Sequence, residues 1–154
     1  MDDIDKKILN ILQNNFRISY KNLGKRLKMA ASSVHNRVQK MLDEGIIKKE
    51  DTIINPMKAG FDTIAIFGLS VDPLKMNEVA EKIASYNEVQ FIATTTGDHD
   101  IIARVFAENE KSLWRFINEK IKIIDGVKPQ MDISSFIDIF KMTHKINFKT
   151  GPNR

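Results

Sequence analysis

Two carboxylates and an imidazole lie beside one glycine in the stretch TTTGDHDIIARV, near the middle of the chain. Asp98, His99 and Asp100 are residue types that bind divalent metals and move protons, so GDHD could form a metal site, a catalytic cluster or a polar hairpin tip that holds another molecule. Three adjacent residues cannot easily all face one ion, and His35 and His144 are distant in sequence. The sequence also has no Walker loop, no GxGxxG and no nucleophile–base set. We therefore expect no enzyme, no metal site and no cofactor.

A second set of side chains has types that suit contact with DNA. Apolar residues at i, i+4, i+7 and i+8 predict a helix with one buried stripe, formed by Val34, Val38, Met41 and Leu42. The opposite, polar face contains Ser32, Asn36, Gln39 and Lys40, flanked by Ser33 and Arg37. Serine and arginine hold phosphates, whereas asparagine and glutamine pair with adenine, and arginine or lysine with guanine, in the major groove. A polar outer face is also common in helical bundles, so the spacing alone leaves both interpretations open.

The positive charge is concentrated near the start of the chain. The first 50 residues contain 11 Lys/Arg against 6 Asp/Glu, whereas the remaining residues contain 13 against 14. Between Arg17 and Lys49, nine basic residues are opposed by Asp43 and Glu44. A basic surface of this kind suits a polyanion, although a solvated charged face has the same composition.

The elements around these residues predict a helix-turn-helix. Asp2 and Asp3 suit the start of a first helix, and Ser19 can cap a second. Gly24 in the second helix indicates close packing by another helix, because glycine costs about 1 kcal/mol relative to alanine there. Gly45 ends the third helix. The apolar positions that give the first two helices their period are Ile4, Ile8, Ile11, Leu12, Tyr20, Leu23 and Leu27.

Two short strands are expected after the third helix. Ile46–Ile47 and Ile53–Ile54 can pair around the charged tip KKED, which would complete a winged helix-turn-helix. In that arrangement the third helix enters the major groove, and Lys48 and Lys49 lie beside the DNA backbone.

The rest of the chain predicts an α+β domain. TIAIFGLSV, EVQFIATTT, DIIARVFA and MDISSFIDIFK favour strands, whereas DPLKMNEVAEKIASY and SLWRFINEKIK have helical spacing. The order βαββαβ predicts a ferredoxin-like sheet with helices on one face. Pro56 and Gly60 mark a linker, so we expect a winged helix-turn-helix domain at 1–54, a linker at 55–62 and a ferredoxin-like domain at 63–154.

Composition indicates the class of protein and the cellular compartment in which it works. At 154 residues, 42% apolar and 29% charged, the chain has the balance of a globular protein. No apolar run approaches the roughly 20 residues that span a bilayer, and MDDIDKK lacks the order of a signal peptide. The absence of cysteine agrees with a reducing compartment. We expect a cytoplasmic protein that does not bind membranes.

The order of these signals resembles the Lrp/AsnC family of transcription regulators, also called feast/famine regulators, over nearly the whole chain. The matching stretches are DDIDKKILNILQNNFRIS, NLGKRLKM, VHNRVQKMLDEGIIK, INP and TTGDHDI. The resemblance implies a first domain that binds double-stranded DNA in the nucleoid, and a second, regulatory (RAM) domain that forms homodimers, often assembled into tetramers or octamers. Because a two-fold dimer presents two recognition helices, the operator should be near-palindromic.

By the same resemblance, TGDHD is the loop between the second and third strands of the regulatory domain, which contacts an amino-acid effector. The residues that it implies for this contact are Thr96, Gly97, Asp98 and Asp100. Gly97 would permit the turn, and the carboxylates could pair with an α-amino group, whereas His99 has no implied role. Family members often carry threonines at the start of the last strand, where this chain has Met131 and Ile133. This departure puts the usual effector specificity in question.

Two other interpretations stay open. An architectural DNA-packaging protein would use the same basic surface with little sequence preference. A sirohaem-decarboxylase-like enzyme would share the two-part fold, but such enzymes use basic residues near the wing that KKE does not clearly supply.

Overall fold

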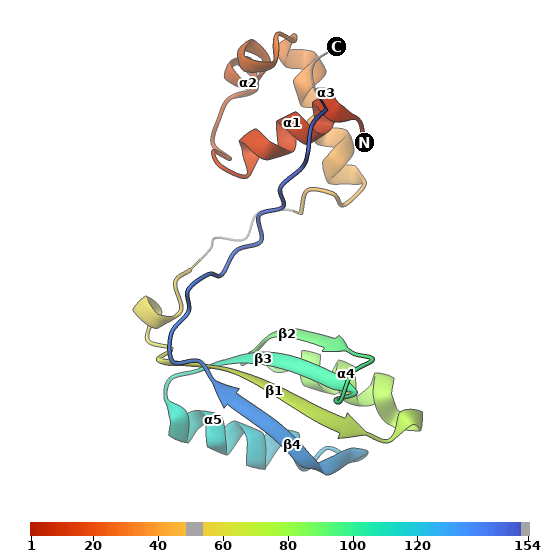
Figure 1. The fold of residues 1–154 in the computed structure, drawn as a ribbon, viewed down its shortest axis with the longest axis vertical. Coiled ribbons are helices and arrows are strands. Elements are labelled where there is room, and N and C mark those ends of the chain that lie inside the picture. The colour runs from red at the N-terminus through yellow and green to blue at the C-terminus, as the bar shows by residue number, and fades with distance from the viewer. Residues whose placement is uncertain (49–53, 152–154) are drawn as a thin grey trace. The chain divides into compact units, whose positions relative to one another are not determined.

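A computed structural model describes residues 1–48 and 54–151 and divides the chain into two compact units (Figure 1). The first unit contains the N-terminal helices together with the segment that begins at Lys141, and the second unit ends at Phe140. The predicted boundaries place this C-terminal segment in the regulatory domain instead. The reason for the difference is a set of contacts between the segment and the first helix, described below.

Three helices make up the first unit: α1 (Asp3–Leu12), α2 (Tyr20–Leu27) and α3 (Ala31–Asp43). The predicted helix starts are confirmed, because Asp2 forms a capping box with Asp5 and the Ser19 side chain accepts from the Asn22 amide. α3 begins after Ala30, which supplies no side-chain cap. The helices bury one core, formed by Ile8, Leu9, Leu12, Leu23, Val34, Val38 and Met41.

The turn between α2 and α3 explains why position 24 has a glycine. A Cβ at this position would lie 2.6 Å from the Met29 carbonyl oxygen, so the close neighbour is the turn itself, with the first residue of α3 behind it. Gly45 follows α3 with φ of +69°, as expected for the residue that ends a helix.

The first predicted wing strand is wrong. Ile46 and Ile47 form a bend, because their amides donate to the Met41 carbonyl and close the end of α3 instead of pairing in a ladder. The expected Lys49 and Ile53 lie outside the described residues, so the rest of the wing stays a prediction.

The second unit is a four-stranded antiparallel sheet in the order β2-β3-β1-β4. The strands are β1 (Thr63–Val71), β2 (Val89–Thr94), β3 (Ile101–Ala107) and β4 (Val127–Ser135). Two helices, α4 (Met76–Ala84) and α5 (Glu110–Phe116), connect β1 to β2 and β3 to β4. Short 3-10 turns span Met57–Ala59 and Pro73–Lys75, and a π-helical turn, Ile117–Ile121, continues α5. This order confirms the ferredoxin-like βαββαβ prediction.

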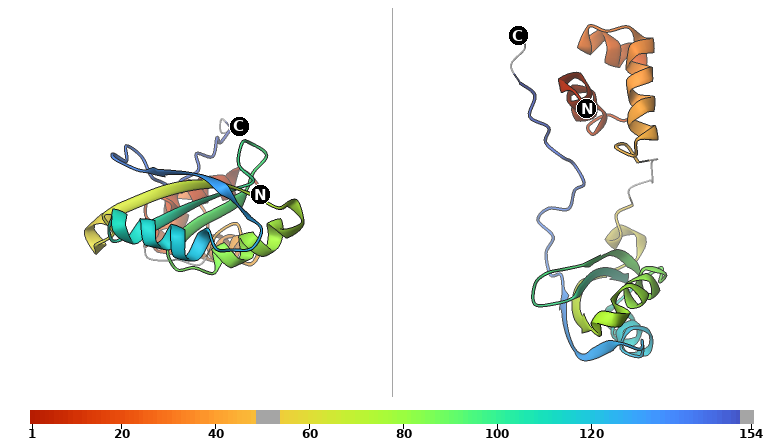
Figure 2. Two further views of the ribbon diagram at one scale, coloured as in Figure 1. Left: turned by 90° about the horizontal axis from the view of Figure 1, so that it is seen from below. Right: turned by 90° about the vertical axis from the view of Figure 1, so that its right-hand side faces the viewer.

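Both helices cover the same face of the sheet (Figure 2). Residues that alternate along β1 and β3, such as Phe67, Leu69 and Ala103, pack against apolar residues of α4 and α5. β4 ends at Ser135, earlier than the alternation of MDISSFIDIFK predicts. The Phe136 amide still donates to the Ile64 carbonyl, but residues 137–141 pair with no described strand. Alternation without a partner strand does not form a sheet.

Candidate functional site

The outer face of α3 is exposed where the sequence places DNA contacts. Ser32, Ser33, Asn36, Gln39 and Lys40 are all exposed, whereas the stripe on the other side of the helix is buried in the core. Lys48 is also exposed. α3 therefore presents amide, hydroxyl and ammonium groups, which are the groups that contact base edges and phosphates.

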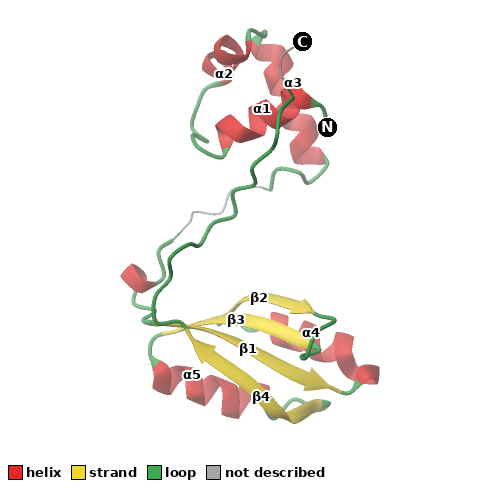
Figure 3. Cartoon of the chain, viewed as in Figure 1, coloured by secondary structure: helices red, strands yellow, loops and turns green. Residues whose placement is uncertain are grey.

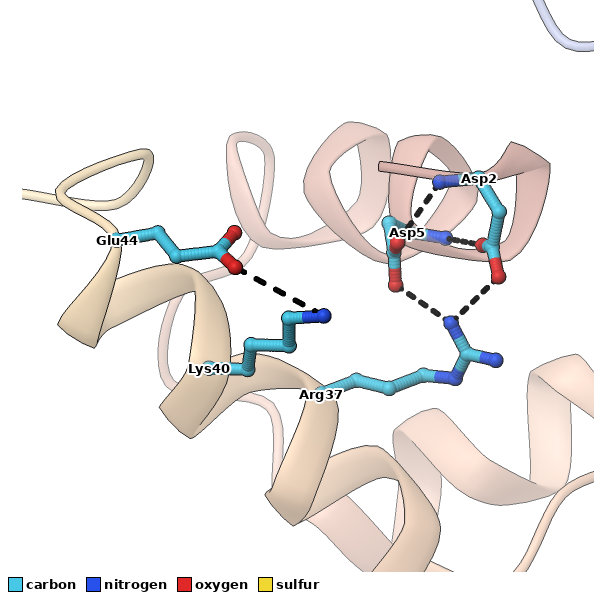
Figure 4. Close-up of polar contacts among 5 residues, drawn as sticks. All are labelled: Asp2, Asp5, Arg37, Lys40 and Glu44. Carbon is cyan, nitrogen blue, oxygen red and sulfur yellow. Dashed lines mark hydrogen bonds and ion pairs between the residues drawn. The ribbon is translucent and has the colours of Figure 1, made fainter.

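Arg37 differs from its neighbours because two carboxylates hold it. Its Nη1 atom lies 2.7 Å from an oxygen of Asp2 and 2.7 Å from an oxygen of Asp5 (Figure 4). The Asp5 side chain is 14% exposed, so this half of the bridge is shielded from water. The pKa of Asp2 is lowered to about 2, first because its carboxylate accepts from the Asp5 amide and next because it accepts from Arg37. The same two carboxylates raise the pKa of Arg37.

Gln39 and Lys40, on the same face, have weaker partners than Arg37. Gln39 donates to Asp43, one helical turn away, at 2.9 Å. Lys40 lies 3.7 Å from Glu44, also one turn away (Figure 4). These pairs are exposed, and such pairs contribute well under 1 kcal/mol. A phosphate or base can therefore displace them at little cost, in contrast to the bridge at Arg37.

A basic hollow beside α2 was not predicted as a site. Its lining includes the exposed cations Arg17, Lys25 and Arg26, together with Asn22 and the capping Ser19. The first helix of a helix-turn-helix crosses the DNA backbone, so cations on α2 are placed to meet phosphates. These cations are part of the charge excess between Arg17 and Lys49. The helical spacing alone does not distinguish residues that bind DNA from residues of a charged face that only contacts water.

The GDHD stretch forms a loop that two hydrogen bonds fasten to β1. The Asp100 carboxylate accepts from the Val71 amide at 2.8 Å, and the Asp100 amide donates to the Leu69 carbonyl at 3.0 Å. The pairing of β1 with β3 ends at Leu69 and Ile101, so the Asp100 carboxylate accepts from a backbone amide just beyond the end of this ladder. Thr95 closes the loop by donating its hydroxyl to the His99 carbonyl.

His99 has a clear structural role that the sequence did not indicate. Its ring lies directly over Gly68, where a Cβ would collide with it, and its Nε2 atom lies 3.2 Å from a carboxylate oxygen of Asp132 on β4. The imidazole is 27% exposed. Glycine at position 68 thus makes room for the ring, and the ring connects the loop to a second strand.

The tip of the loop is exposed at Thr96, Gly97 and Asp98. Gly97 does not have a positive φ, and a Cβ there would meet open space, so the expected need for glycine in the turn is not seen. His99 and Asp100 point to different partners, which argues against a shared ion. Within residues 1–48 and 54–151, no three His, Asp or Glu side chains are arranged to hold a metal.

The two positions that depart from the expected threonines lie on β4. Met131 pairs with Leu69 and packs against the helical side of the sheet, whereas Ile133 is 42% exposed. A methionine side chain that fills the core supplies no hydroxyl for a ligand.

The sheet face opposite the helices is largely apolar. Residues that pair directly across antiparallel strands share a face, and this open face carries Ile66, Ile102, Phe91, Phe106 and Ala93, with Arg104 and Ser134 among them. Phe91 is 51% exposed. Phe106, Ile66, Ile102 and Ala93 are half-buried, and aromatic and aliphatic residues that stay accessible over one sheet face are typical of a surface that a protein partner covers.

Family models match both units. An AsnC-type helix-turn-helix domain matches residues 1–42, and an Lrp/AsnC ligand binding domain matches residues 64–143. The chain belongs to the Lrp/AsnC family of transcriptional regulators. It is therefore a DNA-binding regulator with a ligand-binding domain, as the resemblance implied. In the described part of the chain, no helix has the length and apolarity needed to cross a membrane.

Similar proteins come from archaea and bacteria. An uncharacterized HTH-type transcriptional regulator of Pyrococcus furiosus is 41% identical over 128 residues, which cover 83% of this chain and 86% of that protein. The HTH-type transcriptional regulator Ptr1 of Methanocaldococcus jannaschii is 34% identical over 145 residues, or 92% and 98% of the two chains. Among solved structures, E. coli AsnC superposes with a TM-score of 0.89 at 26% identity and covers 96% of this chain and 98% of its own.

Proposed function

We propose that this regulator recognises specific DNA sequences with the exposed face of α3. The observation that carries the proposal is the contrast around this helix, where Ser32, Asn36 and Gln39 are exposed and the apolar stripe on the other side completes the core. Asn36 and Gln39 are the base-reading candidates, because their amides can pair bidentately with adenine. Ser32, Ser33 and Lys40 would contact phosphates, as would Lys48 and, outside the described residues, Lys49.

Arg37 has a different role in this proposal. The sequence placed it among the DNA contacts, but its guanidinium is engaged by two carboxylates at the start of α1. We assign it to positioning: it fixes the angle between α1 and α3 and so presents Asn36 and Gln39 to the groove.

The open sheet face of the second unit suits a homodimer. Its apolar residues would be covered by the same face of a second copy, which is the self-complementary arrangement of a two-fold interface. Two copies of α3 would then meet major grooves about one helical turn, or a multiple of it, apart, and the operator would be near-palindromic. The same dimers can assemble further into tetramers or octamers.

The GDHD loop would receive the effector through its exposed tip. Thr96, Gly97 and Asp98 are free to approach a small molecule, and the Asp98 carboxylate can pair with an α-amino group. Asp100 would act indirectly, because its carboxylate already holds the loop on β1. We propose an amino acid or a related small molecule as the effector, with a specificity altered by Met131 and Ile133. Such a ligand changes DNA binding only if its affinity differs between two assemblies.

Selection of DNA fragments by the purified protein tests the proposed function. Fragments of genomic DNA would be bound near 0.15 M salt, with and without a mixture of the twenty amino acids, and the retained fragments sequenced. A few fragments that share a near-palindrome support a specific regulator, and a changed set with amino acids supports the effector loop. Retention without sequence preference would contradict specific recognition and indicate a packaging protein.

A further inference from the structure

The segment Lys141–Gly151, which we name the C-terminal strap, belongs to the compact unit of the N-terminal helices. It forms no helix or strand along its described length (Figure 3). Nevertheless, its backbone is held by polar side chains of α1 and of Gln13, the residue that follows this helix, more than 130 residues away in sequence.

Two side-chain amides hold the strap, and each one hydrogen-bonds both the N–H and the carbonyl of a single strap residue. Asn10 donates to the Phe148 carbonyl at 3.0 Å and accepts from the Phe148 amide at 3.4 Å. Gln13 donates to the Ile146 carbonyl at 3.0 Å and accepts from the Ile146 amide at 2.7 Å. Asn10 and Gln13 are three residues apart and so lie on one face of the helix. Ile146 and Phe148 are two residues apart and so turn their backbone groups to the same side of the extended strap, which lets the two pairs meet. The two side-chain amides thus satisfy backbone groups of the strap that a neighbouring strand would satisfy in a sheet.

Contacts beside this ladder set the direction of the strap and anchor it. The Lys145 ammonium donates to the Asn14 side chain at 2.9 Å, so the strap runs antiparallel to α1. Phe148 is half-buried and packs against the core of the three helices. A helical unit of this small size has a small core, and one further aromatic side chain is a large addition to it.

The strap also connects two parts of the protein that act on DNA binding. Only the residues 136–140 separate it from β4, the strand whose Asp132 holds His99 of the GDHD loop. At the other end, α1 carries Asp2 and Asp5, which hold Arg37 of α3. The chain therefore enters the helical unit twice, once at each end of the regulatory unit.

We propose that the C-terminal strap is a releasable element that controls the DNA-binding unit from the regulatory unit. When docked within its own chain, it supports α1 and, through α1, the orientation of α3. When released, it leaves the polar face of α1 to water and removes Phe148 from the core, so the affinity for DNA falls. The docked and released strap are the two states that the regulatory unit can bias. The DNA part of this proposal rests on the proposed function, whereas the docking does not.

Amide hydrogen exchange of the full chain, measured by NMR, tests the docking without DNA. The backbone amides of Ile146 and Phe148 donate to Gln13 and Asn10, whereas those of Asn147 and Lys149 donate to no atom of the described residues. The first two should exchange roughly tenfold more slowly than the other two, because each hydrogen bond shifts the equilibrium between docked and released strap several-fold toward the docked state. The double variant Asn10→Ala/Gln13→Ala should abolish the difference. Asn15→Ala, an exposed asparagine just after α1, should keep it. Uniform exchange over all four amides of the unaltered chain would overturn the docking.

Spin labels decide whether the strap docks in its own chain, and they need no destabilising variant. The chain has no cysteine, so Asn15→Cys and Asn147→Cys, two exposed positions that take no part in the contacts between α1 and the strap, allow one label just after α1 and one on the strap. A short, narrow distance distribution that survives mixing with excess unlabelled chain supports docking within one chain. Loss of the short distance on mixing would overturn it and indicate exchange of straps between copies.

The DNA consequence is measured separately on a fragment selected by the unaltered protein. Asn10→Ala/Gln13→Ala should bind it about tenfold more weakly than Asn147→Ala, a variant at an exposed residue of the strap, at equal salt. Equal affinity would overturn the control of DNA binding by the strap. If the unaltered protein selects no DNA, the proposed function fails, but the exchange and distance measurements still decide whether the strap docks.

Discussion

The bridge from Arg37 to Asp2 and Asp5 allows positioning to be separated from DNA contact. Arg37→Ala removes two charge-assisted bonds of 2.7 Å and leaves the largely shielded Asp5 carboxylate without its cation. Such bonds contribute about 1.5–3 kcal/mol each when protected from water, but Asp2 is 52% exposed and its share must be discounted. We expect a loss of about 1–2 kcal/mol, which corresponds to a fall of roughly 5–15 °C in the midpoint of a domain of this size.

Thermal unfolding followed by NMR signals of α1 and α3 measures this loss in the full chain. Lys40→Ala is the matched control, because Lys40 lies on the same helix and makes an exposed pair at 3.7 Å. It should change the midpoint little and reduce the salt dependence of DNA binding by about one phosphate contact. Arg37→Ala should weaken DNA binding with an unchanged salt slope. An unaltered midpoint together with a salt slope reduced by about one would refute the positioning role.

Three further outcomes follow from the structure. Asn36→Ala should cost about 1–3 kcal/mol at a selected DNA site and little on random DNA, measured by competition binding, and equal losses on both would argue against base reading. Because the folded pKa of Asp2 lies below its ordinary value of 3.8, its stabilising effect is complete above about pH 4 and is lost as the pH falls toward 2. Acid titration of the helical unit should show a loss of at most about 1 kcal/mol in this window, given the exposure of Asp2, and Asp2→Asn should not show it. Gly68→Ala should displace the His99 ring and cost about 1–3 kcal/mol, whereas the double variant with His99→Ala should recover part of that loss; no recovery would show that the ring is not the obstacle.

Much of the fold was predictable because its signals are local. Asp2 and Ser19 cap the helices that they precede, Gly45 ends α3, and the apolar run that predicted β1 matches Thr63–Val71. These signals depend on a residue and its near neighbours, and the packing of each unit agrees with them. The exposed face of α3 was predictable for the same reason, since one helical period decides which side is buried.

The failures of prediction concern partners that are distant in sequence. The segment FIDIFK alternates like a strand, but a strand also needs a free neighbouring edge, which the sequence does not specify. The carboxylates that hold Arg37 lie more than 30 residues away, and the partner of His99 lies on another strand. The docking of the strap was not predictable, because nothing in KINFKTG alone indicates that Asn10 and Gln13 hold its backbone.

A footprint of the protein on a selected fragment tests the central claim most directly. If two copies of α3 read the major groove, the protein should protect two similar segments whose centres lie about one helical turn, or a multiple of it, apart and are related by two-fold symmetry. Asn36→Ala should erase this pattern at concentrations where the unaltered protein gives it. Uniform protection along the fragment, identical for the protein and the variant, would contradict sequence recognition by α3.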